Sequence, residues 1–315
     1  MNINMDTPIV RIENLSHRYS VQWAVRDINL EIRQHGIYGL LGSNGAGKST
    51  IMNIMCGVLK QTEGDIYIKG INTRIDPVEA KCHIGFLPQQ PPLHPDLTVE
   101  EYLDYSARLR YIPHKEIPAA ITEVVEKCGI SHFRKRLIRN LSGGYQQRVG
   151  IAQALIHDPE VVILDEPTTG LDPNQIFGIR KIIKEIGEEK TVILSSHILS
   201  EIETTCDQVM IMSNGKIVAN GTTSELRRKS DAEYCLKIGI KGGATTNIHE
   251  ALNDLPGVLH IEIIHKQNFE LQCKPDVEIE KSIFNLCQKN NWYISELTPV
   301  QTRLEDIFRK VTQNE

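Results

Sequence analysis

The sequence predicts an α/β protein of two domains, the larger of which is built around a parallel sheet. The apolar run at residues 37–41 leads into a glycine-rich loop, after which apolar residues recur at helical spacing. Residues 161–164 are apolar at every position, a pattern typical of a parallel strand covered on both faces. With 315 residues, the chain is also too long for one ordinary hydrophobic core and long enough for two domains.

Composition and charge argue against several classes of protein. The net charge of −5 gives no overall attraction for nucleic acid, so no nucleic-acid partner is expected. No apolar run approaches the roughly 20 residues that span a bilayer, and residues 1–8 lack the features of a secretory signal. The seven cysteines form no C-x-x-C pair, which argues against a disulfide framework or a zinc site. Any membrane role would need a separate partner that spans the bilayer.

Two strands with alternating apolar residues are predicted at residues 9–15 and 25–32. Tyr19 lies in the segment between them, shortly before the glycine-rich loop. An aromatic ring at this point could stack on an adenine base, and it would also suit a half-buried position in a strand.

The glycine-rich loop carries the phosphate-binding pattern G-x-x-x-x-G-K-S. Its residues are Gly42, Ser43, Asn44, Gly45, Ala46, Gly47, Lys48 and Ser49, and Thr50 follows as a further candidate for nucleotide binding. The backbone N–H groups of such a loop point at phosphate oxygens, and the next helix adds the positive end of its dipole. The pattern assigns Lys48 to the β- and γ-phosphates and the Ser49 hydroxyl to Mg²⁺. The alternative is a strand-to-helix turn without a ligand. The helix is expected to carry an apolar stripe of Ile51, Ile54, Met55, Val58 and Leu59.

Residues 84–92 run from an apolar strand into a segment that three prolines make extended. Within it, Gln89 has an amide group that can bind a cation or orient a water, although taken alone it would indicate nothing. Thr98 and Glu101 predict a capping box at the start of a helix that ends near Leu109. Another helix is expected over residues 117–128.

A further helix is predicted to begin after Leu141, Ser142, Gly143 and Gly144, with Ser142 as its N-cap. Small residues at a helix start leave the N–H groups open, so this segment is a second candidate anion site. An ordinary cap followed by a flexible turn is the alternative.

Acidic residues follow the buried strand at residues 161–164, at the end where α/β sheets place their chemistry. Asp165 suits Mg²⁺, and Glu166 suits a general base that polarises a water toward a γ-phosphate. A loop with Asp172 comes next. The strand at residues 191–195 then leads to His197 at the same sheet edge, where a histidine also suits a structural role.

The polar segment at residues 225–231 predicts a boundary between a domain of residues 1–226 and one of residues 227–315. Strand and helix patterns are mixed beyond it, which predicts a small α/β domain without a catalytic constellation. Packing or dimerisation is one role for such a domain, and regulatory ligand binding is the other.

Together, residues 9–226 resemble the nucleotide-binding subunit of ATP-binding-cassette (ABC) transporters. Residues 42–49 are similar to the family's Walker A motif, and residues 161–166 to its Walker B motif with the catalytic glutamate. Residues 141–144 are similar to the signature motif, although Tyr145 follows where glutamine is commonest. Four single residues correspond to the adenine-stacking aromatic, the Q-loop, the D-loop and the switch histidine: Tyr19, Gln89, Asp172 and His197.

This resemblance implies a fold and a mechanism. The fold would be a P-loop NTPase domain with a RecA-like core, an antiparallel β subdomain and an α-helical signature subdomain. Lys48, Glu166 and His197 would carry catalysis, while Ser49, Gln89 and Asp165 would hold Mg²⁺. In the family, the signature of one subunit covers the ATP bound to the Walker A motif of the other, so two chains would enclose two ATP molecules.

The resemblance also implies partners and a location. A homodimer of this chain, or a heterodimer with a second cassette, would power an integral-membrane permease from the cytoplasm, at the inner face of the cell membrane. Residues 302–308 are similar to the ending of cassettes that serve exporter-type permeases.

Two other functions stay open at this point. A soluble ABC ATPase acting on ribosomes or DNA would need no membrane partner, but such proteins usually carry two cassettes or an inserted coiled coil or zinc element. A binding module without hydrolysis is disfavoured by intact Lys48, Asp165, Glu166 and His197.

Overall fold

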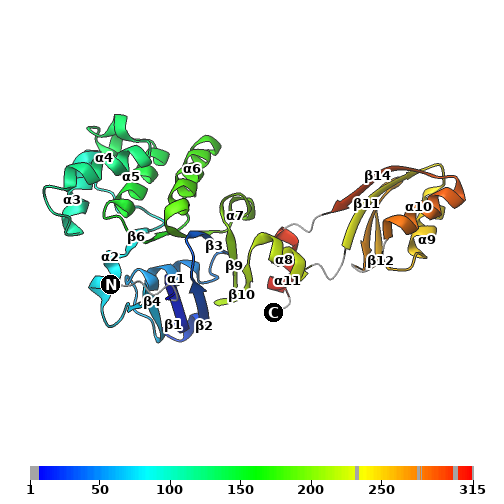
Figure 1. Ribbon diagram of the computed structural model, residues 1–315, viewed down its shortest axis with the longest axis horizontal. Helices are drawn as coiled ribbons and strands as arrows, with labels where there is room; N and C mark the ends of the chain where they lie inside the picture. Colours follow the sequence, from blue (N-terminus) through cyan, green and yellow to red (C-terminus); the bar gives the residue numbers. More distant parts are fainter. Residues whose placement is uncertain (1–6, 231–233, 275–276, 278, 301–303, 314–315) are drawn as a thin grey trace. The chain divides into compact units, whose positions relative to one another are not determined.

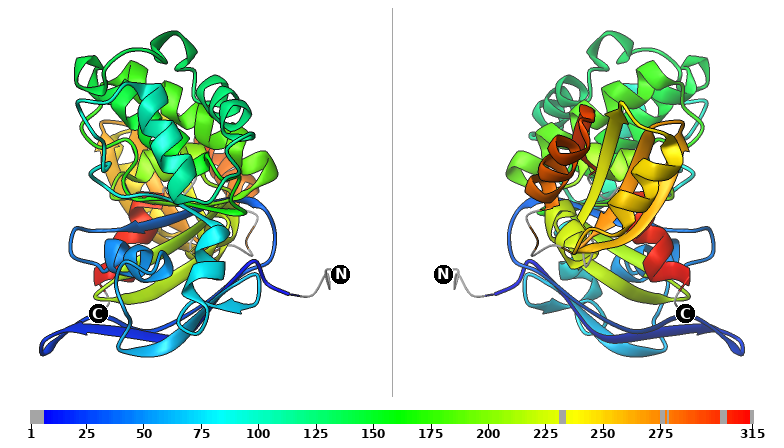
Figure 2. Two further views of the ribbon diagram at one scale, coloured as in Figure 1. Left: turned by 90° about the vertical axis from the view of Figure 1, so that its left-hand side faces the viewer. Right: turned by 90° about the vertical axis from the view of Figure 1, so that its right-hand side faces the viewer.

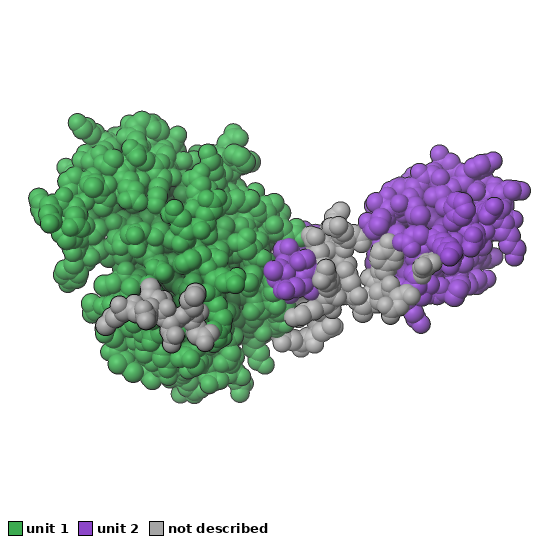
Figure 3. Space-filling view, in the orientation of Figure 1, with its two compact units in different colours: residues 1–221 green, residues 222–315 purple. Residues whose placement is uncertain are grey.

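The computed structural model describes residues 7–230, 234–274, 277, 279–300 and 304–313. The chain forms two compact units, residues 1–221 and 222–315 (Figure 1, Figure 3). The division falls before helix α8 (Thr223–Ser230), and not after residue 226 as the polar composition suggests, because α8 packs against α11 (Leu304–Gln313) of the second unit. The exporter-like ending begins at residues 302–303, outside the described residues. None of the described helices is long and apolar enough to cross a membrane.

The main sheet of the first unit has the strand order β10-β9-β3-β8-β7-β6. All its neighbouring strands are parallel except β9 and β10, which form a hairpin at Asn214 and Gly215. The bounds are β3 Gly36–Gly42, β6 Ile84–Leu87, β7 Val161–Leu164, β8 Thr191–Ser196, β9 Gln208–Ser213 and β10 Lys216–Gly221. Every residue of β7 is buried, as its apolar run predicts for an interior parallel strand.

A second sheet, with the order β2-β1-β4-β5, is antiparallel throughout. Its bounds are β1 Val10–Tyr19, β2 Gln22–Ile32, β4 Glu63–Ile68 and β5 Ile71–Asn72. The β1–β2 hairpin is longer than predicted, so Tyr19 ends a strand and does not lie in a joining loop. Both strands continue through polar residues at the hairpin, so a prediction from the spacing of apolar residues places their ends too early or too late.

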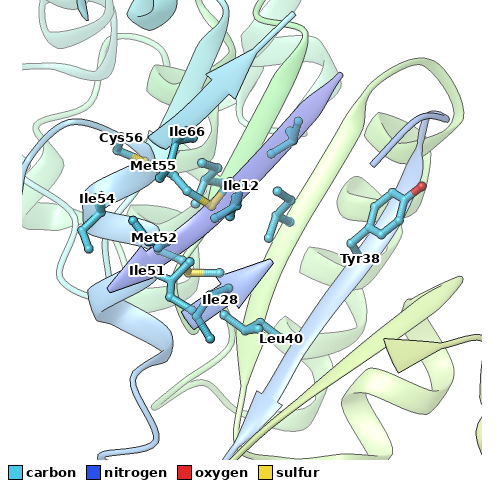
Figure 4. Packing of buried hydrophobic residues seen from close by; sticks show 14 of the residues in the cluster. Ile12, Ile28, Tyr38, Leu40, Ile51, Met52, Ile54, Met55, Cys56 and Ile66 are labelled. Carbon is cyan, nitrogen blue, oxygen red and sulfur yellow. The ribbon is translucent and has the colours of Figure 1, made fainter. Parts of the chain in front are cut away.

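The core of the first unit joins the two sheets through helix α1 (Lys48–Met55). Figure 4 shows Ile51, Met52 and Met55 of α1 among the side chains of Ile12 and Leu40, which come from different sheets. The helix ends at Met55, and Val58 is 68% exposed, so the predicted apolar stripe stops short of Val58. Packing between the sheets therefore fixes the position of the glycine-rich loop, which lies directly before α1.

The first unit also contains a group of packed helices: α3 (Val99–Leu109), α4 (Ile117–Lys127) and α5 (Gly143–Leu155). Figure 2 shows these green and cyan helices gathered on the opposite side of the unit from the blue β1–β2 hairpin. Thr98 and Glu101 form the predicted capping box at the start of α3. Helices α2 (Pro77–Cys82), α6 (Pro173–Glu189) and α7 (Leu199–Thr205) complete the unit, with the short 3₁₀ turns η1 (Ser131–Phe133) and η2 (Ile138–Asn140).

The second unit contains a four-stranded sheet of order β12-β13-β11-β14 with a core around Phe269 and Leu252. Its elements are β11 Tyr234–Lys241, α9 Thr245–Asn253, β12 Val258–His265, β13 Asn268–Cys273, α10 Ile279–Asn290 and β14 Tyr293–Val300. The predicted mixture of helices and strands is present. Each described strand pair is antiparallel, because α9 and α10 each connect strands that are separated in the sheet by another strand. The unit is therefore more narrowly an α+β unit with the ferredoxin-like β-α-β-β-α-β order.

Candidate functional site

A cavity of about 610 Å³ lies over the loop between β3 and α1. The predicted nucleotide-binding residues in its wall are Tyr19, Asn44, Gly45, Gly47, Lys48, Ser49, Thr50, Gln89, Glu166 and His197. They come from β1, the loop, the segment after β6 and the ends of β7 and β8. Parallel strands deliver their carboxyl ends to one edge of the sheet, which is why residues so distant in sequence meet.

The glycine-rich loop is curled around the side chain of Lys48. The Nζ atom of Lys48 donates hydrogen bonds to the carbonyl oxygens of Gly42 and Ser43, at 2.8 and 3.1 Å. Gly47 has φ of 104°, and a Cβ atom there would lie 2.7 Å from the carbonyl oxygen of Ala24. The loop therefore requires glycine at this position, both for its backbone angle and for its close approach to the β2 strand.

Lys48 is a buried cation at the edge of the cavity. Its side chain is 5% exposed, and Nζ lies 3.9 Å from Oε1 of Glu166. Burial lowers the pKa of Lys48, while the charges of Glu166 and Asp165 oppose that shift. A phosphate group in the cavity would restore the electrostatic stabilisation that the lysine loses through burial.

The carboxylate of Glu166 is surrounded by polar side chains. Oε1 lies 3.1 Å from Nδ1 of His197, and Oε2 accepts hydrogen bonds from Thr169 Oγ1 at 2.9 Å and Gln89 Nε2 at 3.4 Å. Because an ionised carboxylate can only accept, the contact with His197 places a proton on Nδ1. The arrangement fixes the orientation of a carboxylate that faces the cavity.

The backbone of Glu166 is held in a strained conformation. Its φ of 48° lies in the left-handed region that non-glycine residues rarely adopt. Its N–H donates to Ser195 Oγ at 2.8 Å, and the same hydroxyl donates to Asp165 Oδ1 at 2.6 Å. Ser195 thereby ties the end of β8 to both acidic residues that follow β7.

The residues expected to hold a cation are divided between two places. Ser49 and Gln89 belong to the wall of the cavity, whereas Asp165 is 3% exposed and lies behind the wall with Ser195. Within the described part of the chain, no group of three or more His, Cys, Asp or Glu residues could hold a metal ion. This donor set fits Mg²⁺ bound together with a nucleotide, because Mg²⁺ takes few protein ligands and completes its shell with phosphate oxygens and water.

The predicted second anion site lies outside this cavity. Helix α5 begins at Gly143 with Ser142 at the predicted N-cap position, and the Ser142 side chain makes no capping hydrogen bond to the described residues. Ser142 and Gly143 are exposed, while Leu141 and Gly144 are buried. The exposed N-terminus of α5 is thus open to an anion from outside the chain.

Gly144 and Asp172 belong to the contact between α5 and α6. A Cβ atom on Gly144 would lie 2.1 Å from Oε1 of Gln175, so a larger residue would require the Gln175 side chain of α6 to move. The side chain of Asp172 caps α6 by accepting from the N–H groups of Asn174 and Gln175, at 3.0 and 3.1 Å. The start of α5 and the loop that carries Asp172 therefore lie side by side within one chain.

Several residues that line or support the cavity were not predicted. Thr169 and Ser195 contact Glu166, and Gln22, Trp23 and Ala24 of β2 form part of the wall. Trp23 follows Tyr19 in the hairpin and is 37% exposed. A second aromatic residue shortly before the glycine-rich loop is the sequence feature that could have indicated this part of the wall.

The chain is similar in sequence and in structure to known ATP-binding proteins. Residues 25–169 match a family model described as ABC transporter. The bacitracin transport ATP-binding protein BcrA of Bacillus licheniformis is 39% identical over 305 residues, covering 96% of this chain and 97% of that protein. The linearmycin resistance ATP-binding protein LnrL of Bacillus subtilis (strain 168) is 30% identical over 312 residues, covering 96% and 98%. The solved dimeric structure of the ATP-binding cassette MJ0796 in a post-hydrolysis state with ADP and Pi has a TM-score of 0.62 and 27% identity, covering 68% of this chain and 98% of that one.

Proposed function

The chain belongs to the ABC transporter family of ATP-binding ATPases, and from this premise we propose that it is the subunit that binds and hydrolyses ATP to power export through a separate membrane permease. The observation that carries the proposal is the convergence of Lys48, Glu166 and His197 on one cavity above the glycine-rich loop. A buried lysine can stabilise the charge of a transferring phosphoryl group, and an oriented carboxylate held by a histidine can position the attacking water.

Binding of ATP uses the loop and the β1–β2 hairpin. Lys48 and the N–H groups of the loop hold the β- and γ-phosphates, while the half-exposed ring of Tyr19, at the end of β1, stacks on the adenine. Ser49 and Gln89, with Asp165 behind them, would hold Mg²⁺, which would neutralise phosphate charge.

Hydrolysis depends on Glu166 as a general base. A water oxygen attacks the γ-phosphorus, the bond to the bridging oxygen of ADP breaks, and the water's proton passes to a carboxylate oxygen of Glu166. His197, hydrogen-bonded to that carboxylate, orients the base. Lys48 stabilises the negative charge that develops on the transferring group.

Each ATP-binding site is completed by a second subunit. Ser142 and Gly143 present an exposed helix start that takes no part in lining the cavity of their own chain. In a two-fold symmetric dimer, the α5 N-terminus of each subunit would contact the γ-phosphate bound by the other. ATP then favours the closed dimer, and its hydrolysis removes the differential affinity that holds the dimer together.

A groove of about 850 Å³ in the first unit is suited to the permease. Its rim carries exposed apolar side chains, including Val58, Val78, Leu109 and Tyr111, a type of surface that marks interaction sites. Phe86 of β6 also lines the groove, and Gln89 follows three residues later in the wall of the ATP cavity. A permease segment bound there, at the inner face of the membrane, would be coupled to the nucleotide through β6 and the residues after it.

The names of two relatives refer to bacitracin transport and linearmycin resistance. We therefore place the exported substrate among antibiotic-type compounds. Cargo selection would lie with the permease, because the ATP cavity is occupied by the nucleotide.

The experiment that tests this function is affinity purification of the full chain from detergent-solubilised native membranes. A multi-span protein that co-purifies in constant proportion, and that raises the rate of ATP hydrolysis, supports the proposal. Absence of such a protein, together with ATPase activity stimulated by ribosomes or DNA, would favour the soluble ABC ATPase instead.

A further inference from the structure

A buried carboxylate lies outside the ATP cavity, in helix α7. Glu201 is 6% exposed, and its Oε2 atom accepts hydrogen bonds from Thr168 Oγ1 at 2.7 Å and Ser196 Oγ at 3.1 Å. Its Oε1 atom lies 3.8 Å from the guanidinium of Arg180 in α6. A carboxylate is retained in such a place only with hydrogen-bond donors or a countercharge, and both are present.

The two hydroxyl donors belong to the two segments that carry Glu166 and His197. Thr168 follows Glu166 by two residues in the segment after β7, and Ser196 directly precedes His197 at the end of β8. Glu201 therefore links, through one carboxylate oxygen, the segments whose side chains meet at 3.1 Å in the cavity.

Consecutive serines at the end of β8 point to opposite sides, as successive side chains of a strand do. Ser195 bonds to Asp165 and to the N–H of Glu166, whereas Ser196 bonds to Glu201 and accepts from the N–H of Ile198 at 3.0 Å. Two sets of hydrogen bonds thus link the segments at the ends of β7 and β8, one on each side of the sheet. Ser195 makes the first set, and Glu201 accepts the second.

The space beside Glu201 is too small for a ligand. The adjoining cavity measures about 10 Å³ and is lined by residues that include Thr168, Arg180 and Thr205. Such a volume holds at most one water molecule. The carboxylate therefore acts on the protein and not on a second bound compound.

We propose that Glu201 is a positioning residue for ATP hydrolysis, which sets the separation between the His197 imidazole and the Glu166 carboxylate. The inference rests on the proposed ATPase mechanism and adds to it a residue that does not touch the nucleotide. Its effect on the His197 imidazole passes through Ser196, one of the two residues that Glu201 holds, because Ser196 is covalently joined to that histidine.

The test is a double-mutant cycle of Glu201→Gln and His197→Ala in the full chain, with kcat and KM for Mg-ATP measured. Glutamine keeps the size of the side chain but carries one oxygen acceptor in place of a carboxylate. Since a small misplacement of a catalytic group costs up to about 100-fold, we expect E201Q to lower kcat by about 10- to 100-fold with KM changed less than about 2-fold. In the H197A background, E201Q should lower kcat by less than about 2-fold further.

The matched control is Thr205→Val in the same helix. Thr205 lines the same small cavity, and its hydroxyl has no hydrogen-bond partner among the described residues, so T205V should leave kcat unchanged. An unchanged kcat in E201Q, or an equal loss from E201Q with and without His197, would overturn the positioning role.

A second measurement separates this inference from the proposed function. If the wild-type chain hydrolyses no ATP, the proposed mechanism fails, and amide hydrogen exchange then tests Glu201 without activity. Peptides covering residues 166–171 and 195–199 should exchange faster in E201Q than in the wild type and in T205V. Equal rates of amide hydrogen exchange in all three proteins would contradict the proposal that Glu201 links the segments after β7 and β8.

Discussion

The Nζ atom of Lys48 and the Oε1 atom of Glu166 lie 3.9 Å apart, and both side chains are almost fully buried. Burial lowers the pKa of Lys48, and the charge of Glu166 opposes that shift. The pair brings the proposed phosphate-binding group and the proposed general base together in the wall of the cavity. Removing either partner leaves an uncompensated charge in a poorly solvated place.

Lys48→Ala is expected to lower kcat/KM for ATP by at least about 100-fold, because one charged donor to the transferring phosphate is lost. Isothermal titration with Mg-ATP and a phosphate-release assay measure binding and turnover separately. Lys60→Ala, at an exposed position shortly after the same helix, is the control and should behave as wild type. Unchanged turnover in K48A would place the active site elsewhere.

Gly144→Ala should destabilise the first unit by about 1 kcal/mol, at the low end of overpacking, because the Gln175 side chain must turn away from the new methyl group. The new Cβ would lie 2.1 Å from Oε1 and 2.8 Å from Cγ of Gln175. Gly143→Ala is the matched control, since its Cβ would have Leu171 Cδ2 as its nearest neighbour at 3.8 Å. Urea denaturation measures both variants, and Gln175→Ala should restore most of the stability that G144A loses. Equal stabilities of G143A and G144A would contradict this packing.

Burial, together with the charge of Arg110, lowers the pKa of His157 from 6.5 to about 4. Between these values the unfolded chain binds a proton that the folded chain does not, so stability is present above pH 6.5 and is lost as pH falls toward 4. His157→Gln should remove about 2 kcal/mol of the stability decrease between about pH 7.5 and pH 5. The exposed His114→Gln serves as control in urea denaturation at each pH. If the free energy of unfolding has the same pH dependence in H157Q and in the wild type, the pKa of His157 is not lowered in the folded chain.

Leu109→Asp and Tyr111→Asp should weaken co-purification with the permease by about 10-fold or more, since each places a charge on an apolar contact surface. These side chains are 60% and 86% exposed, so folding and ATP binding by the isolated chain should be unaffected. Phe284→Asp, which is 61% exposed in the second unit, is the control for a charge on another apolar surface. Normal recovery of the permease with both groove variants would exclude the groove as its docking site.

Features of the site that depend on neighbouring residues could be predicted from the sequence. The phosphate loop, the capping box of Thr98 and Glu101, and the strand that delivers Asp165 and Glu166 each depend on contiguous positions. The match to ABC transporter proteins agrees with the resemblance that these motifs indicated.

Features that depend on strand order could not be predicted in the same way. Ser195 and Glu201 contact residues about 30 positions earlier in the chain, because β8 lies beside β7. Nothing in their local sequence distinguishes a serine that bonds Asp165 from one that faces solvent. The N-cap position of Ser142 could be predicted from its neighbours, whereas the lack of a capping hydrogen bond from its side chain to the described residues could not.

The composite site is the central claim, and Glu166→Gln tests it most directly. This variant keeps the nucleotide-binding residues and removes the general base, so bound ATP should persist. Sizing chromatography with Mg-ATP should show a species of twice the 35.6 kDa of one chain, with one ATP per subunit, and Ser142→Arg in the same background should return it to monomer. An E166Q chain that binds ATP yet remains monomeric at all protein concentrations would contradict a site shared between two subunits.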